Sequence, residues 1–102
     1  AHLNDVLRTT FLTGQVFLTD GIRALPDNVR CQVVSAVREF SVFTSDNDPH
    51  GEHDFGSIDH EVAGRVFWKI DYYDLSLTAG SENPADPSIT RRVITIMLAS
   101  EY

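Results

Sequence analysis

Two segments of the chain carry hydrophobic residues at helical spacing. The first has apolar residues every three or four positions, at Leu3, Val6, Leu7 and Phe11. This spacing predicts a short helix that begins near Asn4 and ends near Gly14. The second segment follows Pro26 and Asp27, which favour a helix start, and its apolar positions are Val29, Val33, Ala36, Val37 and Phe40. It predicts the clearest helix of the chain, with one buried face and one charged face.

Three other segments have the pattern of strands. Residues 15–19 are rich in β-branched and aromatic side chains, and Asp20-Gly21 predicts a turn after them. Residues 66–73 alternate Val66, Trp68, Ile70 and Tyr72 with Phe67, Lys69, Asp71 and Tyr73, which predicts a central strand whose first set faces the core. Residues 93–98 predict a further strand, with a helix from Asp86-Pro87 as the alternative.

Residues 78–88, between the last two predicted strands, predict a surface loop. Residues 57–61, before the 66–73 strand, form too short and mixed a segment to assign. The sum is one domain over residues 1–102 of the α+β class. We expect two helices packed on a mostly antiparallel sheet of three or four strands.

The charge of the chain is concentrated in its middle. The net charge is −7, and residues 46–86 hold ten acidic and two basic side chains, which gives this segment −8 and leaves +1 for the rest. Such a field repels phosphate backbones and attracts basic protein surfaces. We therefore expect a partner protein with a basic surface and no direct contact with nucleic acid.

The composition also indicates the cellular compartment of the protein. The single cysteine, Cys31, cannot form an internal disulfide, which favours a reducing compartment, and we interpret it as a packing residue of the second helix. No apolar run approaches the roughly 20 residues of a membrane span, and the start of the sequence does not resemble a signal peptide. We expect a cytoplasmic protein that does not engage membranes.

The segment DNDPHGEHDFG (residues 46–56) gathers most of the candidate chemistry. Carboxylates and imidazoles on a turn-rich segment suit metal coordination, proton transfer or binding of a basic partner. The structural alternative is that Asp46, Asn47, Asp48 and Asp54 cap backbone amides in successive turns.

An enzymatic alternative follows from the same loop. A metal-dependent hydrolase or nuclease would use His50, Glu52, His53 and Asp54 as catalytic groups, since a nearby carboxylate orients an imidazole and raises its basicity. His50, His53 and Asp54 would then be the ligands of a divalent metal such as zinc. No recognisable nucleophile accompanies them, and apart from this alternative we expect no cofactor.

Three long segments carry a family resemblance: FTSDNDPHGEHDFG from Phe43, FWKIDYYD from Phe67, and PADPSITRRVITIMLASEY from Pro84. Together they resemble the bacterial domain-of-unknown-function family three-seven-six-eight. The resemblance implies small stand-alone proteins that are often found on plasmids and other mobile elements. It supplies no activity or catalytic residues. The setting and the acidic charge together suggest inhibitors of restriction or CRISPR nucleases, as an analogy of context.

Our leading hypothesis is a small acidic interaction module rather than an enzyme, with inhibition of a nucleic-acid-handling machine as its expected action. Complementary fields speed association and disfavour wrong partners. The partner-binding residues of this hypothesis are Asp46, Asp48, Glu52, Asp54, Asp71 and Asp74. A further alternative is homo-oligomerisation through the exposed face of the 66–73 strand, where Phe67 and Tyr73 are typical of interfaces.

Overall fold

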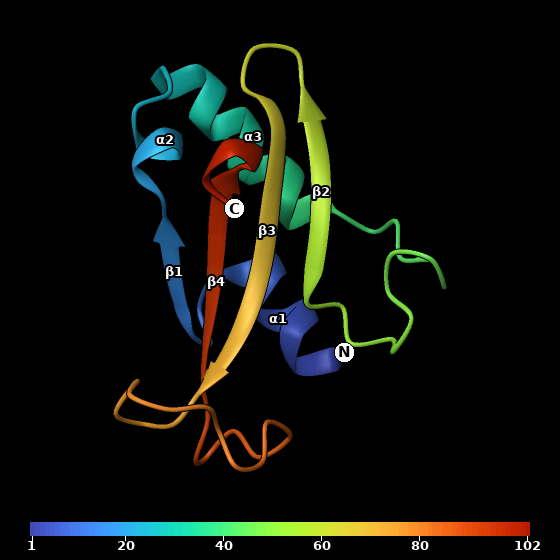
Figure 1. Cartoon of the computed structure of the whole chain (residues 1–102), viewed down its shortest axis with the longest axis vertical. Coiled ribbons are helices and arrows are strands. Elements are labelled where there is room, and N and C mark those ends of the chain that lie inside the picture. The colour runs from blue at the N-terminus through green and yellow to red at the C-terminus, as the bar shows by residue number, and fades with distance from the viewer.

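Four strands form one open sheet with the helices gathered on one side of it (Figure 1). The computed structural model describes residues 1–102. The strands are β1 (Gln15–Leu18), β2 (Phe55–His60), β3 (Gly64–Tyr73) and β4 (Arg91–Leu98), in the spatial order β1-β4-β3-β2. The pairs β2–β3 and β3–β4 are antiparallel, and β1–β4 is parallel. The predicted class, α+β with a mostly antiparallel sheet, is confirmed.

The helices are α1 (His2–Thr10), α2 (Asp20–Arg23) and α3 (Asp27–Glu39), and a short 3-10 helix, η1 (Ala99–Glu101), follows β4. The two predicted helices are α1 and α3. The predicted turn at Asp20-Gly21 is wrong, because α2 is a single helical turn there. Its start is held by the Glu101 carboxylate, which accepts hydrogen bonds from the Thr19 hydroxyl and the Gly21 N–H. This contact joins residues 80 or more apart, so local sequence gives no sign of it.

The first helix is also shorter than its apolar spacing predicts. It ends at Thr10, because Phe11 adopts a left-handed conformation with φ of 60° and its N–H caps the Leu7 carbonyl. The Thr9 and Thr10 hydroxyls bond back to carbonyls one turn earlier, which weakens a helix end.

The core lies between the sheet and helices α1 and α3. As the alternation of residues 66–73 predicts, Val66, Trp68 and Ile70 are buried, and β3 is an interior strand. Trp68 is fully buried, and Gly56 on β2 makes room for it, since a Cβ there would lie 2.4 Å from the indole nitrogen. The predicted C-terminal strand is confirmed as β4, and the helix considered as its alternative from Asp86-Pro87 does not form.

The other face of the sheet has no helical cover. Phe55, Phe67 and Tyr102 lie together there, with ring centroids 5.4–6.0 Å apart. Met97 is on the same face and is only 3% exposed. The Lys69–Asp71 and Arg65–Asp59 ion pairs flank these apolar residues, so the charges of this face balance locally.

Candidate functional site

A buried arginine joins α1 to the end of α3 and to the base of the acidic loop (residues 44–54). Arg8 is 4% exposed and donates hydrogen bonds to the carbonyls of Val37 and Arg38 in the last turn of α3. Its guanidinium lies 5.4 Å from the ring centroids of both Phe43 and Trp68. The cation thus donates to two carbonyls at the C-terminal end of α3, of which that of Val37 also accepts the Phe40 N–H, and it contacts two aromatic faces.

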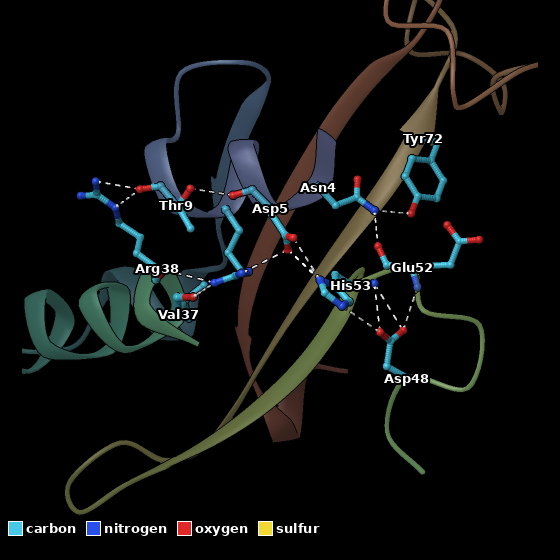
Figure 2. Close-up of polar contacts among 10 residues, drawn as sticks. Asn4, Asp5, Thr9, Val37, Arg38, Asp48, Glu52, His53 and Tyr72 are labelled. Carbon is cyan, nitrogen blue, oxygen red and sulfur yellow. Dashed lines mark hydrogen bonds and ion pairs between the residues drawn. The ribbon is translucent and has the colours of Figure 1, made fainter. Parts of the chain in front are cut away.

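A short chain of charged groups runs from Arg8 into the loop. Oδ1 of Asp5 lies 3.3 Å from the Arg8 guanidinium and 2.9 Å from Nδ1 of His53. The other imidazole nitrogen, Nε2, lies 3.5 Å from the Asp48 carboxylate. Figure 2 shows His53 held between the two carboxylates, one from α1 and one from the loop. Because an ionised carboxylate only accepts hydrogen bonds, the Nδ1 atom carries the hydrogen toward Asp5.

The imidazole of His53 is fixed by packing as well. Its ring stacks on Phe43 at a centroid separation of 3.8 Å and an interplanar angle of 5°. The residue itself adopts φ of 54°, a left-handed conformation that few non-glycine residues take. This conformation turns the side chain back against the body of the protein, where Phe43 and Asp5 receive it.

Asp48 folds the loop around its own carboxylate. The side chain is 7% exposed and accepts hydrogen bonds from the Glu52 and His53 N–H groups. Asn47 closes the preceding turn, with its side chain bonded to the Thr44 N–H and the Val42 carbonyl. Of the four predicted caps, Asn47 and Asp48 have this role and Asp46 and Asp54 do not.

A second polar group lies beside the start of α1. The Asn4 amide, 2% exposed, donates to the Tyr72 hydroxyl at 2.8 Å and to the Glu52 carbonyl at 2.9 Å (Figure 2). The Tyr72 hydroxyl donates to Asp54 at 3.1 Å. Arg92 lies over the Tyr72 ring and donates to the Asn4 side-chain oxygen. The C-terminal end of the acidic loop is therefore attached to α1 and β3, and Arg92 on β4 bonds the same Asn4 side chain.

Burial shifts the two titrating groups of this second cluster. It raises the pKa of Tyr72 to about 12, with the neighbouring Asp54 carboxylate adding to the rise and the Asn4 hydrogen bond opposing it. Burial lowers the pKa of Arg92, against the attraction of Tyr72 and Glu52. Arg92 is thus part of strand β4 and of this cluster.

The six predicted partner-binding carboxylates do not occupy one patch. Asp46 and Glu52 are exposed on the loop and form no ion pair. Asp48 is turned inward. Asp54 accepts the Tyr72 hydroxyl. Asp71, on β3, pairs with Lys69 on the open sheet face, and Asp74, just after β3, accepts hydrogen bonds from Ser76 and Thr78, which lower its pKa.

The alternative catalytic and metal-binding residues are not brought together either. His53 is engaged on both ring nitrogens, Asp54 receives the Tyr72 hydroxyl, and His50 is exposed at the loop tip. No group of three or more His, Cys, Asp or Glu side chains in the structure is arranged to hold a metal ion. None of the helices is both long enough and apolar enough to span a bilayer.

Sequence reasoning missed the residues that hold this site. The apolar spacing predicts only a helix start near Asn4 and gives Asp5 and Arg8 no role. A signal was present, because Asn4 and Arg8 are four residues apart and share a helix face with buried Leu7. Polar residues on a buried helix face indicate a polar network beneath it.

Replacement of Asp48 tests whether this carboxylate holds the loop. We expect Asp48→Ala to lower the free energy of unfolding by about 1–3 kcal/mol, since it leaves two amides and His53 without their acceptor. The matched change Asp46→Ala, at an exposed position without a cap, should stay within about 0.5 kcal/mol of wild type. Urea unfolding of both variants measures the difference, and equal losses would contradict the role of Asp48.

Replacement of Tyr72 tests the second cluster through pH. An unfolded tyrosine loses its proton near pH 10, whereas folded Tyr72 keeps it until about pH 12. In this window the unfolded chain binds fewer protons, so stability falls as the pH rises. Tyr72→Phe should lose about 1 kcal/mol at neutral pH, from its hydrogen bonds, and should show a shallower fall above pH 10. The control Tyr73→Phe should keep the wild-type pH dependence. Parallel curves for all three proteins in urea unfolding would contradict this assignment.

Comparison with known proteins gives a family and no activity. No curated protein and no solved structure matches the chain. The sequence model of a family described as "Protein of unknown function (DUF3768)" matches residues 18–101. The match includes the acidic loop and strands β2, β3 and β4, and it agrees with the resemblance found in the sequence. The chain belongs to the DUF3768 family.

Proposed function

We propose that the protein is a protein-binding module that presents its 44–54 loop, as a fixed acidic surface, to a basic surface of a partner protein. The observation that carries the proposal is a contrast within the loop. Asp48 and His53 are turned inward and hold the backbone, while Asp46 and Glu52 are turned to solvent without a cationic partner.

The inward contacts matter because a preformed loop loses less conformational entropy on binding than a disordered loop does. Ordering a segment on association costs conformational entropy that reduces affinity. Here the loop is closed by its own hydrogen bonds and stacked on Phe43 before any partner arrives. A loop with no contacts of this kind would have to be ordered by the partner.

The free carboxylates supply the recognition. Asp46 and Glu52 are exposed carboxylates, and neither forms an ion pair with an arginine or lysine. Asp54 has no ion pair either, but it is half-buried and accepts the Tyr72 hydroxyl. Exposed charges that are not neutralised internally keep their attraction for a basic partner. Asp71 and Asp74 are a weaker part of the proposed surface, since each already has a partner of its own.

The expected class of partner follows from this charge. Basic surfaces of the required kind are typical of proteins that handle nucleic acids, because those surfaces neutralise phosphates. An acidic module that occupies such a surface would act as an inhibitor, which is the action we propose. The proposed setting is the cytoplasm, where a lone exposed thiol such as Cys31 stays reduced.

A double charge reversal tests the proposed surface. The variant Asp46→Lys/Glu52→Lys changes the charge of the loop by four units without touching its inward contacts. Wild type and variant are immobilised and exposed to a bacterial lysate at low and high salt, and the retained proteins are quantified. We expect basic nucleic-acid-handling proteins to bind the wild type at low salt, to be released at high salt, and to be at least about tenfold depleted on the variant.

The control variant reverses the charge of two carboxylates near the end of β2 that is farther from the loop. Asp59→Lys/Glu61→Lys makes the same change in net charge, and strand geometry places it roughly 20 Å from the loop. It should retain the wild-type set of proteins. Equal depletion by both variants would mean that only net charge matters, and equal retention on the loop variant and the wild type would refute the acidic surface.

A further inference from the structure

Strand β1 leaves backbone groups open at one edge of the sheet. It pairs only with β4, and the Thr19 N–H donates to the Ile96 carbonyl just beyond its end. Successive residues of a strand direct their N–H and C=O groups to opposite sides. The backbone N–H and C=O groups of Phe17 therefore point toward β4. Those of Val16 and Leu18 point outward, where Figure 1 shows no further element.

This edge lacks the features that usually protect one. Its sequence, Gln-Val-Phe-Leu, contains no charge and no proline, and Val16 and Phe17 are 36% and 57% exposed. The opposite edge, β2, carries the Asp59–Arg65 ion pair and ends in His60. Natural sheets protect their edges with charged residues, prolines or covering elements, because a bare edge pairs with other strands.

A groove runs along the inner side of the same edge. It has a volume of about 520 Å³ and lies between β1 and the exposed side of α3. Leu18 and Val34 form its apolar floor, Cys31 lies beside them, and Arg30, Arg38 and Glu39 stand around it. The exposure of Cys31 corrects the expectation that this residue packs in the core.

We propose that β1 and α3 form a docking site for an extended segment of a partner protein, which adds to the sheet as a fifth strand. The open N–H and C=O groups of Val16 and Leu18 hydrogen-bond the backbone of the added strand. Side chains of that strand on the helix side enter the groove. Backbone pairing at an edge combined with a pocket for alternate side chains is an established mode of peptide recognition.

The walls of the groove define the occupant. An apolar side chain fits the floor of Leu18 and Val34. A carboxylate next to it is favoured by Arg38, whose guanidinium donates to the Thr9 carbonyl and has no carboxylate partner, whereas Arg30 is already paired with Asp27. A second copy of the chain fits less well, because its own edge offers no acidic residue and each copy carries a net charge of −7.

This site is separate from the proposed acidic surface. It lies on β1 and α3 and takes a segment with apolar and acidic residues, whereas the 44–54 loop takes a basic surface. The Asp46→Lys/Glu52→Lys variant should therefore bind the added segment as wild type does, and each proposal can fail without the other.

The test uses random-sequence peptides displayed on phage and selected on the wild-type protein. The selected peptides are synthesised, and their affinities are measured for wild type and four variants. Val16→Pro removes one outward N–H and leaves the β4 ladder intact, because that N–H is not part of it. Its control, Val16→Ala, keeps the N–H. Cys31→Trp fills the groove, and Gln32→Trp adds the same side chain at the exposed neighbouring position.

We expect selected peptides with an apolar residue next to an acidic one. Val16→Pro and Cys31→Trp should each weaken their binding at least about tenfold, and the two controls should not. Bound peptide should also slow hydrogen exchange at the Val16 and Leu18 amides and slow alkylation of Cys31. If Val16→Pro does not fold, the comparison of peptide affinity between Cys31→Trp and Gln32→Trp tests the proposal.

Three results would overturn the proposal. One is the failure of the selection to yield any binding peptide, and another is undiminished binding by both Val16→Pro and Cys31→Trp. The third is a dimer in light scattering whose Val16 and Leu18 amides are slow to exchange before peptide is added, since a second copy would then occupy the edge.

Discussion

The buried guanidinium of Arg8 is the contact on which the rest of the molecule depends. A charge in an apolar interior costs free energy unless it is paired and hydrogen-bonded. Arg8 is paired with the Asp5 carboxylate and donates to two carbonyls at the end of α3, and only its Nε has no partner. Removing a partner from a fully buried pair typically costs about 3–5 kcal/mol, and the loss here is smaller, because the Asp5 side chain is 37% exposed to solvent. The position of α1 against α3 is therefore specified by Arg8 together with Arg38, whose guanidinium donates to the Thr9 carbonyl from the other helix.

The same cation determines where the acidic loop lies. The Asp5 oxygen that meets Arg8 also meets His53, and Phe43 contacts both the guanidinium and the imidazole. Beside the Asn4 and Tyr72 contacts, the loop is thus connected to the core through one histidine in an uncommon backbone conformation. A segment with this composition is usually a mobile surface loop. Here its acidic surface has a defined shape because one of its own carboxylates and one from α1 hold the histidine.

Much of the fold could be predicted from the sequence. The alternation in residues 66–73 and the helical spacing from Val29 to Phe40 reflect burial, and burial is decided locally by side-chain pattern. The end of α1 and the helical turn α2 could not be predicted in the same way. The end of α1 depends on the left-handed conformation of Phe11. The turn α2 depends on Glu101, whose hydrogen bonds to Thr19 and Gly21 join distant parts of the chain. The open edge at β1 was not visible either, because strand order is a property of the whole sheet.

The position of the candidate site could be predicted from the sequence, but the roles of its individual residues could not. The 44–56 segment did contain the unusual chemistry, yet Asp46 and Asp48 look alike in sequence and have opposite roles in the structure. One is turned to solvent and the other is buried as an acceptor. Asp71 and Asp74 added charge to the same stretch of sequence, but β3 carries them to another face and another loop.

The central claim is that residues 44–54 are held in a fixed conformation before any partner binds. Backbone 15N relaxation measures this directly. The account predicts order parameters of about 0.85 in this loop, similar to those of β3, and a fall toward 0.6 in His53→Ala, which loses the stack on Phe43 and the bridge to Asp5. Wild-type order parameters below about 0.6 across the loop would contradict it.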